Sequence, residues 1–440
     1  MIFLAIVLKK VLTKLAFMSI IYPIAFVAVI FVYRRKGVMK FTTKLLAFVL
    51  ATAMMLCVFS FTSCNAENPA KQNEKIKIGL TGPLTGGASI YGVAVKNAAK
   101  MAIDEINAAG GLDGIMFELE MLDDKHDPST VENLYAKLYE GGMQVSLGTV
   151  TTKPALNFKN FAKEDNVFFL TPSATGDDVP EFANGYQMCF ADSNQGTAAA
   201  KYFNENYKGK KVGVFYKSDD EYSVGIYNNF KNNLDTSFGD ISSTTAVFTG
   251  DASTFDSQIQ MLKDCEIIFM PIYYTPASQF MTQAKNVENN ISVYYGCDGF
   301  DGIEAIKGFD INSIDQEISY LSHFNSTATE GPAAEFIAKY NEIYDEEKEP
   351  VNQFGAAAYD CVYAIYEAMK FAKSNGKKID VGISASDLCE ILKEVFNDDS
   401  FEFRGITGKT EGNEKSHITW KADGTVQKEA IKYIAKAAKA

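Results

Sequence analysis

The stretch IKIGLTGPLTGGASIYGVAVKNAAKMAIDEINAAGG, residues 76–111, decides the fold. Its first part, Ile76–Leu80, is a short apolar run that predicts a strand. A loop of Gly, Pro and Thr follows. Apolar residues then recur at helical spacing over Ser89–Asn107, and Gly110-Gly111 ends the pattern. A strand that leads through a glycine-rich loop into an amphipathic helix predicts an α/β protein.

The same alternation continues through the rest of the chain. Further strands are predicted at Met116–Met121, Gln144–Gly148, Val167–Thr171, Val212–Tyr216, Glu266–Met270, Val293–Tyr295 and Ile318–Leu321. Further helices are predicted at Thr130–Tyr139, Pro154–Glu164, Tyr222–Leu234, Phe255–Leu262 and Ala277–Val287. Strict alternation predicts parallel sheets covered by helices on both faces. A chain of 440 residues exceeds one ordinary core, so we expect two lobes of ~150 residues each.

The N-terminal region has the parts of an export signal. Residues 39–63 start with basic Lys40 and Lys44, continue as an apolar run and end just before Cys64, after which the sequence turns polar. This pattern resembles a bacterial lipoprotein signal, in which that Cys is lipidated; Phe61 stands where such signals usually carry Leu. An uncleaved transmembrane anchor is the alternative. Residues 64–75 are interpreted as the lipidated Cys and a polar tether.

An additional uncharged segment, Leu15–Tyr33, precedes this signal and is long enough to cross a bilayer of ~30 Å. Because Met39 alone already starts a complete signal peptide, we interpret residues 1–38 as a start-site extension. An extra hydrophobic helix is the alternative reading.

Charge and cysteine content exclude several classes of protein. Residues 1–63 hold eight of the 42 basic residues and no acidic one, which leaves 34 basic against 55 acidic residues and a formal net charge of −21 after Ser63. Such an acidic body predicts no nucleic-acid partner. The five body cysteines, Cys189, Cys265, Cys297, Cys361 and Cys389, are scattered and form no CxxC pair, so we expect buried apolar residues, with one disulfide left open.

Hydroxyl-bearing loops follow two of the predicted strands. They are Thr149-Val-Thr-Thr152 and Thr171-Pro-Ser-Ala-Thr175. In parallel sheets such loops lead into helix N-termini at the edge where ligands bind, and hydroxyls beside backbone donors suit a carboxylate. Taken singly, each residue is more often a helix cap or turn former.

An ordered series of motifs resembles a known family. The series is Ile78-Gly-Leu-Thr-Gly-Pro-Leu-Thr-Gly86, Tyr91-Gly92, Ala102-Ile-Asp-Glu-Ile-Asn-Ala-Ala-Gly-Gly111, Asp123-Asp124 with Asp127-Pro128, and Thr171-Pro-Ser-Ala-Thr175. It is similar to the type I periplasmic binding proteins, and within them to the leucine/isoleucine/valine-binding proteins of ABC importers. The resemblance runs from about Ile76 to the C-terminus and is strongest up to Thr175.

This resemblance implies two Rossmann-like lobes joined by three crossovers, with the solute bound between them. Lobe 1 would comprise residues 76–192 and 325–405, and lobe 2 residues 193–324 and 406–440. The crossovers would lie near Ala191–Asn194, His323–Asn325 and Gly405–Gly408.

The resemblance also implies the ligand-binding residues. In the first lobe they are Tyr91, Thr151 or Thr152, Ser173 and Thr175. In the second lobe they are Tyr222, Tyr273 or Tyr274, and Asp298, which would take the ammonium of an amino acid. The residue types fit this role, because a zwitterion that leaves water needs donors for its carboxylate and a counter-charge for its ammonium. A solvated turn is the alternative interpretation for Asp298.

Signatures of catalysis or metal binding are lacking in the sequence. The segment that ends in Gly408-Lys409-Thr410 is similar to the end of a P-loop, but Phe403 stands where a Gly is required. The three histidines lack metal-ligand spacing, and His126 is interpreted as part of a solvated loop. We therefore expect no enzyme, cofactor or metal, and a monomeric, exported lipoprotein that captures an amino acid, possibly a branched-chain one or a related small amide, for an ABC permease. A sensory module signalling to a membrane partner and an exported enzyme are the alternatives.

Overall fold

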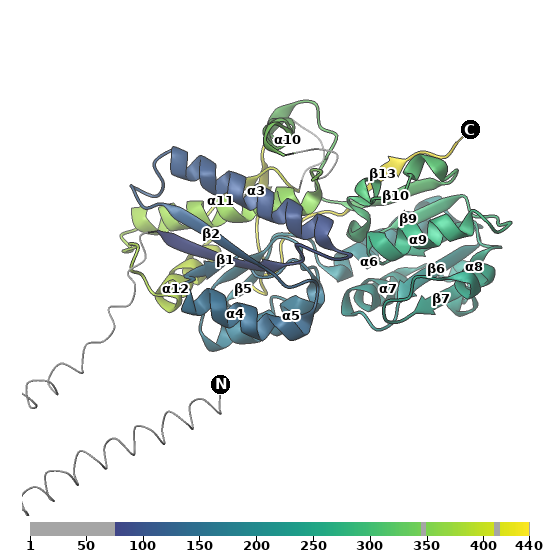
Figure 1. The fold of residues 1–440 in the computed structure, drawn as a ribbon, viewed down its shortest axis with the longest axis horizontal. Helices are drawn as coiled ribbons and strands as arrows, with labels where there is room; N and C mark the ends of the chain where they lie inside the picture. The colour runs from purple at the N-terminus through teal and green to yellow at the C-terminus, as the bar shows by residue number, and fades with distance from the viewer. Residues whose placement is uncertain (1–74, 345–348, 409–413, 440) are drawn as a thin grey trace, which may run out of the picture. The chain divides into compact units, whose positions relative to one another are not determined.

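The computed structural model describes residues 75–344, 349–408 and 414–439 (Figure 1). The predicted signal peptide, Cys64, nearly all of its tether and the segment before Met39 lie outside these residues. In the described part of the chain, no helix has both the length and the apolar content needed to span a membrane.

The first lobe is built on a five-stranded parallel sheet in the order β2-β1-β3-β4-β5 (Figure 1). Its strands are β1 (Ile76–Gly82), β2 (Phe117–Asp123), β3 (Val145–Ser146), β4 (Phe169–Thr171) and β5 (Gly185–Gln187). Its helices are α3 (Ser89–Ala108), α4 (Val131–Glu140), α5 (Thr152–Glu164), α11 (Gln353–Ser374) and α12 (Ala385–Phe396). Side chains alternate between the two faces of the sheet: Phe168 and Leu170 join the core under α3, α11 and α12, whereas Val167 and Phe169 join the core under α4 and α5.

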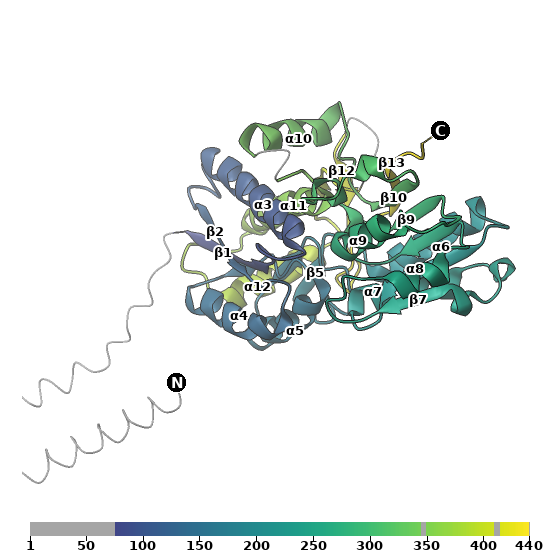
Figure 2. The ribbon, with the colours of Figure 1, turned by 45° about the vertical axis from the view of Figure 1, so that its right-hand side comes forward.

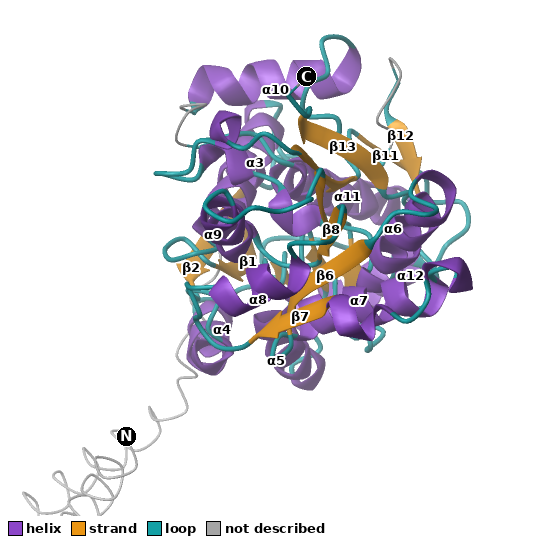
Figure 3. Ribbon diagram, turned by 90° about the vertical axis from the view of Figure 1, so that its right-hand side faces the viewer, coloured by secondary structure: helices purple, strands orange, loops and turns teal. Residues whose placement is uncertain are grey.

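The second lobe is built on a six-stranded sheet in the order β13-β10-β9-β8-β6-β7, in which β13 alone runs antiparallel. Its strands are β6 (Val212–Lys217), β7 (Thr245–Phe248), β8 (Ile267–Met270), β9 (Val293–Gly296), β10 (Glu317–Ser322) and β13 (Ile431–Lys436). Its helices are α6 (Asp192–Asn206), α7 (Glu221–Asn233), α8 (Asp256–Leu262) and α9 (Tyr274–Ala284). Figure 3 shows α6 and α7 on one side of these strands and α8 and α9 on the other.

Two further elements complete the described fold. Helix α10 (Gly331–Ile343) lies beside α3 (Figure 2), where the Tyr344 hydroxyl donates to the Asn97 carbonyl at 3.0 Å. Strands β11 (Phe403–Gly405) and β12 (Ser416–Ile418) form an antiparallel pair. The predicted lobe division at residue 405 therefore falls between two strands of one ribbon.

The chain passes between the two sheets three times: from β5 to α6, after β10, and from β12 to β13. Direct hydrogen bonds hold the crossing segments together. The Gly408 amide donates to the His323 carbonyl at 2.7 Å. The Lys428 ammonium donates to the Met188 carbonyl and to the Thr407 hydroxyl, both at 2.5 Å. The three crossovers therefore form one connected hinge region.

Candidate functional site

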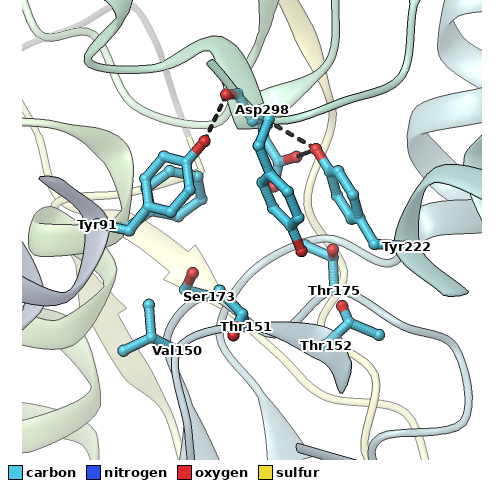
Figure 4. Close-up of a pocket in the computed structure, with 11 residues that line it drawn as sticks. Tyr91, Val150, Thr151, Thr152, Ser173, Thr175, Tyr222 and Asp298 are labelled. Atoms are coloured by element: carbon cyan, nitrogen blue, oxygen red, sulfur yellow. Dashed lines mark hydrogen bonds between the residues drawn. The ribbon is translucent and has the colours of Figure 1, made fainter. Parts of the chain in front are cut away.

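A narrow cavity lies between the two lobes (Figure 4), with about 220 Å³ of space between atoms when the open solvent at its mouth is included. It is lined by Tyr91, Val150, Thr151, Thr152, Ser173, Thr175, Tyr222, Tyr273, Asp298, Gly299 and Phe354. Eight of the nine predicted ligand-binding residues are among these. The structure thus brings together side chains from both lobes that lie far apart in the sequence.

The wall from the first lobe consists of hydroxyls at the carboxyl ends of parallel strands. Thr151 precedes α5 and Thr152 begins it, so both lie at the positive end of that helix. Ser173 and Thr175 lie in the loop after β4. The Thr171 hydroxyl ties the two loops together by donating to the Thr149 carbonyl at 2.7 Å. Hydroxyls at a helix N-terminus make this wall suited to an anionic group.

Tyr91 completes this side of the cavity from α3. Its ring is buried and packs edge-on against Phe354, with ring centroids 4.9 Å apart. Its hydroxyl donates to the carbonyl of Gly299 in the second lobe at 2.5 Å. Burial raises the pKa of Tyr91 well above its usual value, so the hydroxyl stays a donor. The neighbouring Gly92 permits this placement, because a Cβ there would lie 2.0 Å from the Pro83 carbonyl oxygen.

The wall from the second lobe is centred on Asp298. Strand β9 ends at Gly296, and only Cys297 separates it from Asp298. Its side chain is 2% exposed and accepts a hydrogen bond from the Tyr222 hydroxyl at 2.6 Å. Its backbone amide donates to the Gln195 side chain at 2.9 Å. Burial raises the pKa of Asp298 to about 7. Among the described residues no Lys or Arg pairs with this carboxylate, so it is suited to receive a cationic group.

Two more buried carboxylates lie behind this wall. Asp192, at the start of α6, is 1% exposed, and its Oδ1 has no hydrogen-bond partner among the described residues. Burial raises the pKa of Asp192 well above its usual value and the nearby Asp298 adds to the rise, while a hydrogen bond with Thr175 opposes it. Asp220 caps α7 and accepts from the Ser223 amide at 3.1 Å; burial raises its pKa too. Neither Asp192 nor Asp220 lines the cavity, so Asp298 is the acidic side chain that the second lobe presents to it.

The sequence left open whether Tyr273 or Tyr274 contacts the ligand, and the two side chains lie at different positions in the structure. Tyr273 lines the cavity and stacks on Tyr222, with centroids 4.6 Å apart and an interplanar angle of 8°. Tyr274 does not line it. Its hydroxyl instead accepts from the Ile90 amide at 3.2 Å, and its ring packs edge-on against Tyr91. Tyr274 is therefore part of the contact between the lobes.

The interpretation of His126 as a solvated loop residue is wrong. Its ring is half-buried, with Nδ1 2.9 Å from the Thr151 hydroxyl and the ring centroid 5.3 Å from that of Tyr273. Burial lowers the pKa of His126, while Asp220 across the cleft raises it. His126 thus supports two of the cavity-lining side chains from behind.

Sequence reasoning missed three lining residues: Val150, Gly299 and Phe354. Val150 lies within the Thr149–Thr152 loop and Gly299 follows Asp298, so the neighbouring motifs could have indicated both. Phe354 stands near the start of α11, far from every motif, and no local signal points to it.

The chemistry expected of a metal or redox site is not found in the described ranges. Within them, no group of three or more His, Cys, Asp or Glu side chains could hold a metal ion. The five body cysteines are buried and free, so the expectation of buried apolar residues is confirmed and the open disulfide does not form.

Comparison with known proteins shows what class of protein this fold and cavity define. The sequence model of the family described as "Periplasmic binding protein" matches residues 75–382, so the chain belongs to that family. Within it, the chain is a type I periplasmic binding protein of the branched-chain amino acid group.

The similar curated proteins carry names of amino-acid-binding proteins. The chain is 31% identical over 235 residues to the Leu/Ile/Val-binding protein BraC3 of Rhizobium johnstonii, an alignment that covers 52% of this chain and 63% of that protein. It is 27% identical over 328 residues to a leucine-, isoleucine-, valine-, threonine- and alanine-binding protein of Pseudomonas aeruginosa, covering 71% of this chain and 83% of that protein.

Solved structures share the fold. The substrate-binding protein of a branched-chain amino acid transporter from Streptococcus pneumoniae, in complex with isoleucine, superposes with a TM-score of 0.67 at 24% identity, covering 83% of this chain and 99% of that chain. A leucine-binding protein from Thermotoga maritima gives a TM-score of 0.68 at 23% identity, covering 82% of this chain and 95% of that chain. Both likenesses confirm the predicted two-lobed α/β fold.

Proposed function

We propose that this protein is the solute-binding component of an ABC importer and that it captures an amino acid between its two lobes. The observation that carries the proposal is the cavity itself. Hydroxyls at a helix N-terminus form one wall, and a buried carboxylate without a described cationic partner forms the opposite wall. An amino-acid zwitterion supplies the two charges that this pair of walls lacks.

Eight of the eleven lining residues have a role in this proposal. Thr151, Thr152, Ser173 and Thr175 hold the carboxylate, and Asp298 receives the ammonium. Tyr222 orients the Asp298 carboxylate through its 2.6 Å hydrogen bond. Tyr91 and Tyr273 cover the ligand. Because the site is assembled from both lobes, binding favours their closure about the three crossovers.

Ligand-induced thermal stabilisation tests this proposal. A ligand that binds only the folded protein at 100 times its Kd stabilises that protein by about 2.7 kcal/mol. We expect at least one amino acid at millimolar concentration to raise the melting temperature of the full-length chain in detergent. The absence of any shift over a complete amino-acid panel and the corresponding small amides would remove the proposal.

We also propose that the protein is exported and held at the outer face of the membrane by lipid on Cys64. The pattern of basic residues, apolar run and Cys in residues 39–64 supports this, with translation starting at Met39. Mass spectrometry of the membrane fraction should find a lipid-modified N-terminal Cys64. Cys64→Ser should either release the protein from the membrane or leave it as the unprocessed precursor. The matched Cys57→Ser, within the apolar run, should leave processing intact. An unmodified Cys64 in the membrane fraction contradicts the anchor.

The partner in this proposal is an ABC permease, to which the monomeric closed protein delivers its solute. Deletion of the gene should abolish uptake of the bound amino acid, and expression of the intact chain should restore it. Uptake that persists unchanged after deletion argues for the sensory alternative.

A further inference from the structure

We propose that His126 is a positioning residue for the ligand carboxylate: its Nδ1–H donates to the Thr151 hydroxyl and so directs the Thr151 proton toward the ligand. This inference rests on the proposed function, because it takes the ligand to be an amino acid whose carboxylate meets the hydroxyls of the first lobe. The observations that carry it are the hydrogen bonding of Thr151, the backbone of the loop that holds His126, and the contact of the imidazole with the second lobe.

The Thr151 hydroxyl has a single hydrogen-bond contact among the described residues. Its Oγ1 lies 2.9 Å from the Nδ1 of His126, and Thr151 is buried. A hydroxyl donates one proton and accepts through its lone pairs, whereas a carboxylate only accepts. Thr151 therefore serves a ligand carboxylate only if its own proton is not given to Nδ1. In that arrangement Nδ1 is the donor and Thr151 Oγ1 the acceptor.

The tautomer of His126 decides between the two arrangements. Burial lowers the pKa of His126 from its usual value of 6.5, so at pH 8 the ring is neutral and carries one proton. With that proton on Nδ1, Thr151 accepts from the ring and donates to the ligand. With the proton on Nε2, Thr151 donates to the ring and turns only lone pairs toward the carboxylate, which repel it.

The loop that carries His126 is held in a costly backbone conformation. Lys125 and His126 both have positive φ, at 55° and 62°. Residues other than glycine pay about 1–2 kcal/mol each for the left-handed region. The carboxylates of Asp123 and Asp124 accept from the amides of Lys125 and His126 at 3.0 and 2.9 Å and so fix the loop. Strain of this kind is typical of binding sites, and here it accompanies the placement of His126 beside Thr151.

The second lobe holds the imidazole from another direction. The ring centroid of His126 lies 5.3 Å from that of Tyr273, with an interplanar angle of 79°. An edge-on aromatic contact restricts rotation of the imidazole about the bond that joins it to Cβ. The ring orientation that presents Nδ1 to Thr151 is therefore supported by both lobes.

Nitrogen-15 NMR of the imidazole rings tests the proton position directly. The chain has three histidines, so few ring signals are expected, and His126→Asn identifies those of His126 by their loss. At pH 8 the full-length chain in detergent should show His126 with a protonated Nδ1 and an unprotonated Nε2. A ring protonated on Nε2 alone would overturn the inference, whether or not an amino acid binds.

Titration calorimetry tests the effect on binding, with the amino acid that gives the largest thermal stabilisation as the probe. His126→Phe keeps an aromatic ring beside Tyr273 but has no donor, and should raise the Kd at least roughly fivefold. His126→Asn should restore most of that affinity, because its amide donates from the position of Nδ1. His417→Phe, at an exposed histidine of β12, makes the same change far from these contacts and should leave the Kd unchanged. Thermal unfolding without ligand checks the fold of each variant.

An unchanged Kd in folded His126→Phe would overturn the inference. Equal losses in His126→Phe and His126→Asn would also overturn it, because the ring would then act by packing and not by donation. Failure of every amino acid to bind the unaltered chain is a distinct outcome, which would remove the proposed function and the carboxylate role of His126 together.

A double-mutant cycle shows whether His126 acts through Thr151. Thr151→Val removes the hydroxyl and keeps the shape of the side chain. In the Thr151→Val background, His126→Phe should cause almost no further loss of affinity, because the hydroxyl that it positions is already absent. Losses that add in full would show that His126 reaches the ligand by another route and would overturn the inference. Should His126→Phe fail to fold, His126→Leu replaces it in the same cycle.

Discussion

Tyr91 and Gly299 are joined by a hydrogen bond that crosses from one lobe to the other inside the cavity, with 2.5 Å between the tyrosine hydroxyl and the glycine carbonyl oxygen. Two neighbouring bonds cross the same gap: the Thr275 hydroxyl donates to the Gly87 carbonyl at 2.7 Å, and the Ile90 amide donates to the Tyr274 hydroxyl at 3.2 Å. Closure of the lobes and contact with the ligand therefore depend on the same tyrosine.

Tyr91→Phe should separate these two roles of Tyr91. The ring stays in the wall, but the bond to Gly299 is lost. A hydrogen bond contributes about 1 kcal/mol net, so the Kd for the ligand should rise roughly fivefold by titration calorimetry. Tyr366→Phe removes a hydroxyl that bonds to the Gly111 carbonyl within the first lobe and should leave the Kd unchanged. Equal affinity in the two variants would show that the bond between the lobes does not support binding.

Asp298→Asn should weaken amino-acid binding by at least roughly 100-fold, since the ammonium would enter the cavity without a counter-charge. Folding should remain intact. No Lys or Arg among the described residues pairs with the buried Asp298 carboxylate, so the substitution breaks no ion pair there. Calorimetry gives the affinity, and thermal unfolding without ligand checks the fold. Asp310→Asn, at an exposed turn residue, is the matched control. Binding retained by the Asp298→Asn variant would remove Asp298 from the ammonium role.

The affinity should also depend on pH through the same residue. Burial places the pKa of Asp298 near 7 in the ligand-free protein, and ammonium binding requires its ionised form. Below pH 7 a proton must leave before the ligand binds, so affinity should fall about tenfold from pH 8 to pH 6. Titrations at several pH values in two buffers measure both the affinity and the released proton. A flat profile in the unaltered protein contradicts this assignment; a flat profile is expected only for Asp298→Asn.

The stability of the ligand-free protein should depend on pH in the opposite direction to the affinity for the ligand. The folded-state pKa of Asp298 lies above the ordinary value of 3.8. The contribution of this group to the stability of the ligand-free protein is therefore complete below pH ~4 and is lost as the pH rises through 7. Denaturation midpoints of the ligand-free protein, compared between the unaltered chain and Asp298→Asn, should converge at low pH. A difference that instead grows as the pH falls would contradict the pKa assignment.

The edge of the sheets where the site lies could be predicted from the sequence, because it depends on strand direction alone. Thr151, Ser173 and Thr175 follow parallel strands, and the carboxyl ends of such strands meet at one edge whatever the details of packing. The contact of His126 with Tyr273 could not be predicted in this way. Its burial requires a side chain from the other lobe, and neither local spacing nor charge pattern encodes that approach.

Strands formed by long-range pairing escaped prediction for a similar reason. β5 includes Gly185, a residue that disfavours strands, and it forms because Phe169 of β4 fills the space beside that glycine: a Cβ at Gly185 would lie 2.4 Å from the Phe169 ring. β13 pairs with β10, a strand more than a hundred residues earlier in the chain, so its strand character depends on that partner. Phe354 reaches the cavity only because α11 returns to pack on α3.

Lys428 should be essential for the stability of the hinge region. Its buried ammonium donates to Met188 and Thr407, and it is the cation that lies near the buried carboxylate of Asp360. Asp360 accepts from the Ile406 and Thr407 amides, both at 2.9 Å, and so fixes the third crossing segment on α11. Lys428→Met leaves this carboxylate buried without its cation.

We expect Lys428→Met to lower the free energy of unfolding by about 3 kcal/mol, because it removes two hydrogen bonds from a charged donor and takes away the cation near the buried Asp360 carboxylate. Denaturant titration measures the change, and Lys421→Met, at an exposed lysine of the same segment, should have almost no effect. The double variant Lys428→Met/Asp360→Asn should be less destabilised than the sum of its single changes, because the second substitution removes the charge that the first left unpaired. Additive losses would show that Lys428 acts through its bonds to Met188 and Thr407 alone, and that the crossovers are held together without help from the charge of Asp360.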